Sequence, residues 1–176
     1  MHLRRVRVLT ICGSPVADGS TARFLAAFAK TYPEHTWAQA PELGTLPLFT
    51  PARLAAGRRG APEVLAKAVA AAEALIVATP EYAHNVPAAL KNAFEWLVAS
   101  GEFWRKPTLA ITCTPHAPRG EDCMRSLVAT LRAVDADVRL EVPLYDVGAQ
   151  LNDGHIAAAS ALREQTDLAL EILVGA

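Results

Sequence analysis

The stretch that most constrains the fold of this chain is an apolar run that leads through a short loop into a helix. Residues 74–79 (ALIVAT) are apolar and rich in β-formers, which predicts a strand buried on both faces, as in a parallel sheet. Pro87 suits the first turn of a helix, in which Leu90, Phe94 and Leu97 recur at helical spacing. The loop between them should therefore lie at the carboxyl end of a buried strand, where open α/β sheets bind ligands.

The composition of this loop favours a flat, partly polar ligand. Pro80 and Pro87 stiffen its ends, so that little chain entropy is lost on binding. Tyr82 offers a ring face, while His84 and Asn85 offer hydrogen-bonding groups and stacking area. An ordinary strand-to-helix connection with a solvated tip has the same composition, and from these residues alone both interpretations stay open.

A second candidate site follows the first predicted strand, at 6–12. Residues 13–21 are rich in Gly, Ser and Thr and open a helix, with Ser20 as a fitting N-cap. Such a loop can bind an anion, because free backbone N–H groups and the helix dipole point at it. The lysine of a Walker A motif and the Gly-x-Gly-x-x-Gly spacing are both absent. A single phosphate monoester, as in FMN, therefore fits better than a triphosphate or a dinucleotide, with a plain capped turn as the alternative.

The chain alternates between strand and helix patterns five times. Further strands are predicted at 35–40, at an edge of the sheet, and at 107–113 and 138–142; helices are predicted at 62–73, 127–134 and 156–173. A turn is predicted at 100–106. The economical fold is a doubly wound, five-stranded parallel sheet in the flavodoxin-like order 2-1-3-4-5, a three-layer α/β/α arrangement. We expect a single domain over residues 1–176.

Cysteine usage and charge narrow the class of protein. Cys113, His116 and Cys123 can be written as three metal ligands, but a fourth ligand is missing and we expect no metal site. Three cysteines give no disulfide framework and fit a reducing cytoplasm. The formal net charge of −1 gives no reason to expect nucleic acid or an anionic membrane as partner, and no apolar run reaches transmembrane length.

Several motifs resemble the signatures of the NAD(P)H-dependent FMN reductase family of flavodoxin-like flavin, quinone, azo-dye and chromate reductases. Pro-Glu-Tyr at 80–82, Pro87, Leu-Lys-Asn at 90–92 and Glu-Trp at 95–96 match its second signature in spacing. Gly-Ser at 13–14, Ser20 and Leu25 resemble its first signature, stretched by one residue. Thr-x-Thr-Pro at 112–115 resembles its third loop.

This chain departs from the family pattern at three places. Ala83 and Asn85 replace an Asn and a Ser, the Arg expected near Val16 is absent, and His116 and Ala117 replace a pair of glycines. These departures motivate an alternative function, in which a flavodoxin-like domain with a degraded flavin site acts as a binding or interaction protein. A one-electron carrier is a further alternative, although flavodoxins are strongly acidic and this chain is nearly neutral. Hydrolysis is disfavoured, since Gly-x-Ser-x-Gly and a carboxylate pair are absent.

The resemblance implies an enzyme that passes hydride from NADPH or NADH to FMN and on to a quinone, azo, metal-oxyanion or flavin acceptor. Because the cofactor carries the redox chemistry, no catalytic side chain is named. The implied phosphate contacts are Ser14, Ser20 and Thr21. The implied ring contacts are Pro80, Glu81, Tyr82, His84 and Asn85 on one side, with Thr114, Pro115 and His116 opposite.

The resemblance also implies a homodimer or homotetramer, formed through the helix that carries Leu90, Phe94 and Leu97. Packing of these three residues onto the sheet is an equally good interpretation. Arg105 and Arg119 are candidates for the 2′-phosphate of NADPH, but the spacing favours neither, so the choice between NADH and NADPH stays open, as does that between FMN as a bound cofactor and FMN as a substrate.

Overall fold

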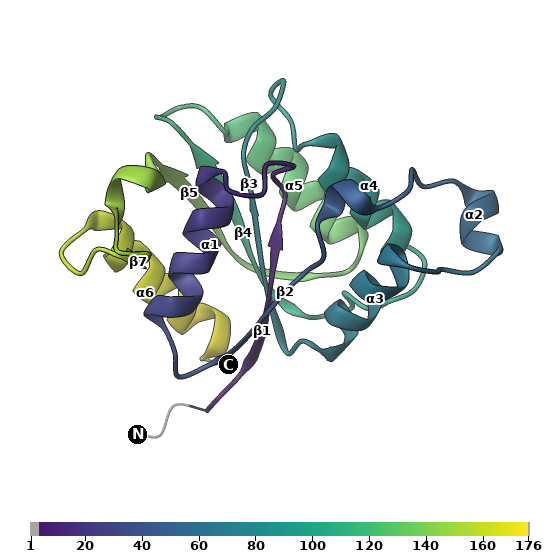
Figure 1. The fold of residues 1–176 in the computed structure, drawn as a ribbon, viewed down its shortest axis with the longest axis horizontal. Helices are drawn as coiled ribbons and strands as arrows, with labels where there is room; N and C mark the ends of the chain where they lie inside the picture. Colours follow the sequence, from purple (N-terminus) through teal and green to yellow (C-terminus); the bar gives the residue numbers. More distant parts are fainter. Residues whose placement is uncertain (1–3, 176) are drawn as a thin grey trace.

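Five parallel strands form the central sheet of the molecule, in the order β2-β1-β3-β4-β5 (Figure 1). In this computed structural model, which describes residues 4–175, the strands are β1 (Arg7–Cys12), β2 (Thr36–Gln39), β3 (Ala74–Thr79), β4 (Pro107–Thr114) and β5 (Asp137–Tyr145). Each neighbouring pair is parallel. The predicted flavodoxin-like strand order is therefore confirmed, with β2 at an edge as expected.

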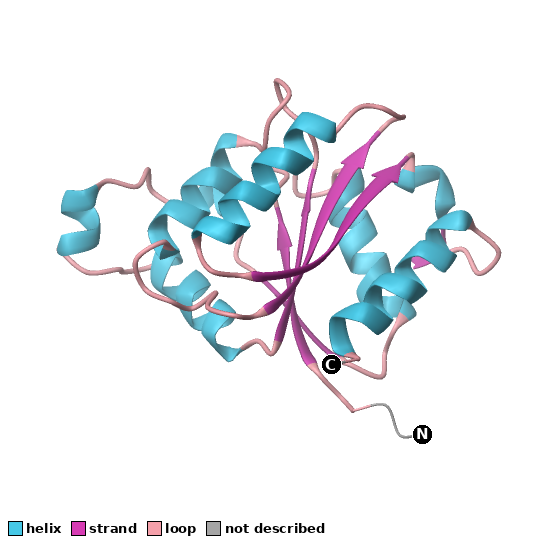
Figure 2. Ribbon diagram, turned by 180° about the vertical axis from the view of Figure 1, so that it is seen from behind, coloured by secondary structure: helices cyan, strands magenta, loops and turns pink. Residues whose placement is uncertain are grey.

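Helices cover both faces of this sheet, which Figures 1 and 2 show nearly edge-on between its two helical layers. The layer on one face contains α1 (Ser20–Thr31) and α6 (Ala161–Val174), and the opposite layer contains α3 (Ala61–Ala71), α4 (Ala88–Leu97) and α5 (Glu121–Ala133). This arrangement confirms the predicted three-layer α/β/α class.

The position of β3 follows from its sequence. All six of its residues are buried, because alternate side chains enter the two cores: Leu75 and Val77 pack toward α3 and α4, and Ile76 and Ala78 pack toward α1 and α6. A strand with no polar face can lie only in the middle of a covered sheet. β3 consequently delivers its loop to the centre of the carboxyl edge.

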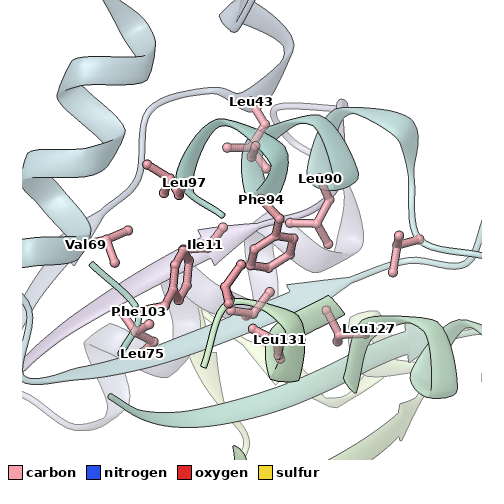
Figure 3. Packing of buried hydrophobic residues seen from close by; sticks show 14 of the residues in the cluster. Ile11, Leu43, Val69, Leu75, Leu90, Phe94, Leu97, Phe103, Leu127 and Leu131 are labelled. Atoms are coloured by element: carbon pink, nitrogen blue, oxygen red, sulfur yellow. The ribbon is translucent and has the colours of Figure 1, made fainter. Parts of the chain in front are cut away.

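The core beneath α4 explains the helical spacing in its sequence. Leu90, Phe94 and Leu97 are at most 3% exposed and pack against sheet residues that include Ile11 (Figure 3). The rings of Phe94 and Phe103 have centroids 5.4 Å apart. Packing onto the sheet is thus what these three side chains do.

Some predicted boundaries are wrong. α1 begins at Ser20 with Gly19 as its N-cap, so Ser20 is not the capping residue. α5 begins at Glu121 rather than 127. The final helix begins at Ala161 rather than 156, because a hairpin of β6 (Leu151–Asn152) and β7 (His155–Ile156) precedes it. The physical cause is an Asp-Gly turn at 153–154 with left-handed φ angles of 47° and 75°.

The connection after β2 contains elements that the sequence patterns did not predict. These are a 3₁₀ turn, η1 (Leu43–Thr45), and a short helix, α2 (Pro51–Ala55), in which no residue is buried. Figure 1 shows α2 set apart from the sheet. The segment that follows α2 is held by Arg58, whose guanidinium donates to Ser100 (2.8 Å) and pairs with Glu102 (2.6 Å). A second 3₁₀ turn, η2 (Val147–Gln150), follows β5.

No helix within residues 4–175 combines the length and the apolar character needed to cross a membrane.

Candidate functional site

A cavity of about 310 Å³ lies where three loops meet at the carboxyl edge of the sheet. The loops follow β1, β3 and β4, the three central strands. Its lining residues are Ser14, Val16, Gly19, Ser20, Thr21, Pro80, Glu81, Tyr82, Cys113, Thr114, Pro115 and Arg119. Both its size and its place, beyond the strand ends of an open α/β sheet, are those of a small-molecule site.

The first wall of the cavity is the loop between β1 and α1. Gly13 N–H donates to the carbonyl of Ala78 (2.8 Å), so this loop starts in contact with β3. A Cβ atom on Gly13 would lie 2.5 Å from Thr79 Oγ1, which no side chain tolerates. Ser14 Oγ accepts from the N–H of Val16 (3.1 Å) and shapes the turn. The close approach of two strand ends thus explains why this position is glycine.

The N-terminus of α1 is left open toward the cavity. Gly19, its N-cap, contributes no side-chain hydrogen bond, and the first turn contains no acidic residue. The first return hydrogen bond runs from Arg23 N–H to Gly19 O (3.0 Å), so the N–H groups of the preceding helical residues have no acceptor within the helix. Free N–H groups and the positive end of the helix dipole favour an anion here, such as a phosphate group.

The second wall, after β3, contains a tight hairpin. Tyr82 and Asn85 exchange backbone hydrogen bonds of 2.9 and 3.0 Å, and Ala83 and His84 between them have left-handed φ angles of 49° and 59°. This is the geometry of a type I′ turn, which favours Asn and Gly at its two central positions. Ala83 and His84 therefore hold the turn under backbone strain, and the turn presents the half-exposed Tyr82 ring at the cavity.

Glu81 ties the second wall to the third. Its side chain is 3% exposed, and Oε2 accepts from the N–H of Gly120 (2.7 Å) at the start of α5. Its other oxygen lies 3.7 Å from Arg119 Nε. The carboxylate therefore closes the N-terminus of α5, a structural task that the sequence motif by itself did not indicate.

The third wall, after β4, is stabilised by hydrogen bonds within the loop and to neighbouring segments. Thr114 Oγ1 donates to the carbonyl of Arg119 (3.0 Å), and the Thr114 carbonyl accepts from Asp146 N–H (3.0 Å). Gly120 has a φ of 96°, and a Cβ atom there would lie 3.0 Å from Thr114 Cγ2, so this position requires glycine. The loop is consequently a rigid wall.

The structure brings most of the predicted site residues together. Ser14, Ser20, Thr21, Pro80, Glu81, Tyr82, Thr114 and Pro115 all line the cavity. Three predicted contacts lie outside this lining. The Asn85 side chain accepts from Ser126 Oγ (2.6 Å) and Val86 N–H (2.8 Å), His84 is 80% exposed between Glu81 and Asp122, and His116 bonds its neighbour Ala117 (3.0 Å) on the exposed loop.

Val16, Gly19 and Cys113 line the cavity but were missed as site residues. Arg119 also lines it, and the sequence had singled it out only as a possible ligand of a 2′-phosphate. Their position could have been inferred from the loops that carry them. Their residue types gave no signal of binding.

The cysteines are thiols of structural character. Burial raises the pKa of Cys113 to about 12, and burial followed by the negative charge of Glu81 raises the pKa of Cys123 to about 12. Cys123 Sγ donates to the carbonyl of Pro80 (3.6 Å), under the second wall. Between residues 4 and 175, no three His, Cys, Asp or Glu side chains gather closely enough to bind a metal ion. Protonated, buried thiols are poor nucleophiles.

Comparison of the sequence with known proteins identifies relatives. The model of the NADPH-dependent FMN reductase family matches residues 6–145. A quinone reductase from Escherichia coli K12 is 30% identical over 142 residues, which cover 76% of this chain and 73% of that protein. Subunit 2 of an NADH-dependent flavin reductase from Lactobacillus johnsonii is 37% identical over 92 residues, which span 52% of this chain and only 48% of the relative.

Solved structures share the fold at low sequence identity. The flavoenzyme NAD(P)H:acceptor oxidoreductase FerB from Paracoccus denitrificans superposes with a TM-score of 0.79, at 18% identity, and the match covers 96% of this chain and 95% of FerB. An NADH:FMN oxidoreductase, EMOB, in its apo form gives a TM-score of 0.72 at 19% identity, and the match covers 96% of this chain and 90% of EMOB. The match of the family model over most of the sequence, with its loops meeting at one cavity, shows that the chain belongs to the NADPH-dependent FMN reductase family, oxidoreductases that use FMN and a reduced nicotinamide.

Proposed function

We propose that this flavin reductase uses FMN bound in the three-loop cavity to oxidise NADPH or NADH and to reduce a quinone. The balanced reaction consumes the reduced nicotinamide, one proton and the quinone, and yields the oxidised nicotinamide and the hydroquinone. When bound, FMN would supply the redox chemistry that links the reduced nicotinamide to the quinone. The chain itself binds and orients the reactants.

The residues around the cavity fit the two chemically different parts of FMN. The open N-terminus of α1, with the hydroxyls of Ser14, Ser20 and Thr21, suits the phosphate, since the lining residues of this wall include hydroxyls and no carboxylate; Asp18, the acid of the same loop, is exposed outside the lining. The proline and tyrosine rings of the second wall, Pro80 and Tyr82, suit a flat ring system. Glu81 contributes by fixing the loops rather than through an exposed carboxylate. His84, Asn85 and His116 stay predicted contacts.

The choice of a quinone as acceptor rests on Tyr82. Its side chain is a large exposed aromatic at the cavity, 46% accessible, and the equally exposed Val16 (47%) lines the same cavity from the loop after β1. An aromatic and an aliphatic group flanking an open cavity favour a flat, apolar second substrate. The name of the Escherichia coli relative, quinone reductase, agrees with this choice.

The test starts with the visible spectrum of the purified protein, after incubation with FMN and removal of the excess. We expect retained flavin that bleaches with NADPH or NADH without oxygen. Turnover with a benzoquinone, an azo dye, chromate and free FMN then compares acceptors, and we expect the largest kcat/KM with the quinone. A larger value for another acceptor would refute the quinone proposal while leaving the reductase activity in place.

Two variants localise the site. Replacing the loop 80–85 by glycines should abolish FMN binding, and retained affinity would contradict this placement. Tyr82→Ala removes a predicted FMN contact and should weaken FMN binding; at FMN concentrations that saturate the variant, kcat/KM for the quinone should still fall about 10-fold, the effect of losing one aromatic contact. Leu168→Ala, at a somewhat more exposed position on α6 (56%), is the control and should change neither value.

The alternative of a degraded flavin site is not favoured. The sequence departures that suggested it were the missing Arg near Val16, together with Ala83, His116 and Ala117. Against it, the hairpin at 82–85 is formed and the N-terminus of α1 is open. If no flavin is retained and NADPH is not consumed with free FMN, that alternative would replace the proposed function.

Association of copies is part of the proposal. A groove of about 280 Å³ between α4 and α5 is lined by apolar residues, including Phe94, Val98 and Ala129, together with Lys91 and Glu95. Val98 is 49% exposed there. The mass in solution should be that of a dimer or tetramer, and Val98→Asp should lower it, whereas Val64→Asp on α3, 55% exposed, should not. A monomeric mass for the unmodified protein would refute association.

The compartment proposed for the protein is the cytoplasm. Cys12, Cys113 and Cys123 are all free thiols, as in proteins of a reducing compartment. Fractionation of cells that express the protein should recover it with cytoplasmic markers, and its recovery with membranes or outside the cell would contradict the assignment.

A further inference from the structure

Among the residues that line the cavity, Arg119 alone has a basic side chain. It lies in the third wall, whereas the open helix N-terminus that suits the phosphate of FMN belongs to the first wall. The strands that carry these walls, β1 and β4, are separated by β3, which places their ends roughly 10 Å apart at the usual strand spacing. The cavity thus offers positive charge at two separate places.

The backbone of Arg119 is fixed. Its N–H donates to the carbonyl of His116 (3.1 Å), and its own carbonyl accepts from Thr114 Oγ1 (3.0 Å). The side chain therefore starts from a defined point, so little backbone entropy is lost when its guanidinium binds a ligand.

The guanidinium is paired only loosely. Nε lies 3.7 Å from Glu81 Oε1, beyond hydrogen-bonding distance, while the other oxygen of Glu81 accepts from Gly120 N–H. Across residues 4–175 the Arg119 side chain makes no hydrogen bond, and it is 50% exposed. Because the separation of Nε from Glu81 Oε1 exceeds hydrogen-bonding distance and the guanidinium is half-exposed, its planar fork of donors is available for a bidentate phosphate.

The structure also decides between the two arginines that the sequence left open. Arg105 lies just before β4, and its N–H bonds the carbonyl of Asp135 (2.7 Å) at the amino edge of the sheet. The eight residues of β4, roughly 26 Å of extended chain, separate it from the cavity. Arg105 therefore cannot reach a ligand bound there.

We propose that Arg119 binds a phosphate group of the reduced nicotinamide dinucleotide and is a binding residue for the electron donor. The inference rests on the proposed function, because it assumes that the donor binds at this cavity. FMN carries one phosphate, for which the α1 N-terminus is the fitting site, so the anion at Arg119 belongs to the second ligand. That phosphate is either the 2′-phosphate, present only in NADPH, or the pyrophosphate, common to NADPH and NADH.

Steady-state kinetics of Arg119→Gln, with Arg105→Gln as the matched control, test this role. Loss of a charge-assisted bidentate contact should raise KM by about 10- to 100-fold with little change in kcat, as for a contact made equally in ground and transition states. A rise for NADPH alone identifies the 2′-phosphate, and an equal rise for both donors identifies the pyrophosphate. Arg119→Lys should recover part of the loss.

Two results would overturn the inference. One is an unchanged KM for both donors in Arg119→Gln. The other is a loss of FMN affinity in that variant, measured by quenching of flavin fluorescence, because the guanidinium would then serve the flavin. Arg105→Gln should match the unmodified protein throughout.

A binding measurement without turnover separates this inference from the proposed function. Calorimetric titration of the FMN-loaded protein with 2′,5′-ADP and with ADP should give affinities that fall about 10-fold or more in Arg119→Gln. If the unmodified protein oxidises neither NADPH nor NADH, the proposed function fails, while Arg119-dependent binding of these fragments would still support the phosphate site. Equal binding by both proteins would overturn the site, whatever the activity.

Discussion

Helices α1 and α5 begin in the same way but differ in what their N-termini are free to do. Each follows a central parallel strand. Each has as its N-cap a glycine, which has no side chain that could accept a hydrogen bond from the first turn. At α5 the carboxylate of Glu81 accepts from Gly120 N–H, and Glu121 and Asp122 add negative charge in the first turn. At α1 the first turn contains no acidic residue. Of these two helices, α1 therefore presents the open, positive N-terminus.

The difference shows that two helices that begin at the same edge of the sheet can have different roles. A helix N-terminus that already has a carboxylate cannot favour a phosphate, because the dipole and the N–H groups are neutralised. The Glu81 carboxylate thus joins the second and third walls of the cavity, and the first wall, at α1, stays free for a phosphate. The following predictions test this contrast.

The largest effect should come from making α1 resemble α5. Ser20→Asp adds a carboxylate to the first turn of α1, where repulsion at close range should weaken FMN binding by at least about 100-fold. The same charge should stabilise the free protein by roughly 0.3–1 kcal/mol, because it complements the helix dipole. Fluorescence titration with FMN and thermal unfolding measure the two effects.

Ala161→Asp is the matched control, since it adds the same charge to the first turn of α6, outside the cavity lining. It should leave FMN affinity unchanged. An FMN affinity of Ser20→Asp equal to that of the unmodified protein would refute the phosphate site at α1.

The next effect comes from opening α5. Glu81→Ala leaves the N–H of Gly120 without its acceptor and should lower the free energy of unfolding by about 1–3 kcal/mol. Glu81→Gln keeps an oxygen acceptor and should lose less than half as much. Urea denaturation checks both, and equal losses in the two variants would show that the hydrogen bond to Gly120 is not the cause.

A third effect concerns the thiol in the first turn of α5. A cysteine at an open helix N-terminus has a lowered pKa, whereas burial and then the charge of Glu81 raise the pKa of Cys123 to about 12. The folded state therefore holds this proton more tightly than the unfolded state, whose thiol titrates near about 8.5. Its stabilising contribution is fully present below that pH and is lost as the pH rises toward 12.

Between about pH 9 and 11, the free energy of unfolding should consequently fall by up to about 1.4 kcal/mol per pH unit more in the unmodified protein than in Cys123→Ala. Urea denaturation across this range gives both slopes. Parallel slopes would mean that the thiol is not held neutral by the fold.

The smallest effect concerns the strained hairpin that precedes α4. Replacing Ala83 by Asn and His84 by Gly supplies the residues that a type I′ turn favours and should raise the free energy of unfolding by about 1 kcal/mol. Ala83→Val, β-branched at a left-handed position, should lower it. If the double variant also loses FMN affinity, the predicted contact of His84 with the flavin gains support; unchanged affinity would remove His84 from the site.

Much of the fold and of the site could be predicted from sequence. The apolar run of β3 predicted that this strand is buried on both faces. The three strand-to-helix loops predicted eight of the residues that line the cavity, because the carboxyl ends of parallel strands meet at one edge of the sheet. The failures have local causes. The cap of α1 lies at Gly19, whose role depends on backbone geometry alone, and the hairpin before α6 interrupts a pattern that looked continuous.

The motif residues Asn92 and Trp96 illustrate a role that sequence could not give. Asn92 bonds the N–H of Phe49 (2.7 Å) and the carbonyl of Pro47 (3.2 Å), and Trp96 Nε1 donates to the same Pro47 carbonyl (2.8 Å). They fasten the connection after β2 to α4, although the two segments are more than forty residues apart. Their partners became visible only once the chain was folded.

The sequence by itself determined the layers, the strand order and the loops that form the cavity, because buried periodicity and turn chemistry are local properties that each segment carries. Only the tertiary structure decided which helix end stays open, that Glu81 closes α5, and that Arg119 rather than Arg105 lines the cavity. These outcomes depend on distances between groups far apart in the chain. A residue type states which bonds a side chain can make, and the fold decides which partner it meets.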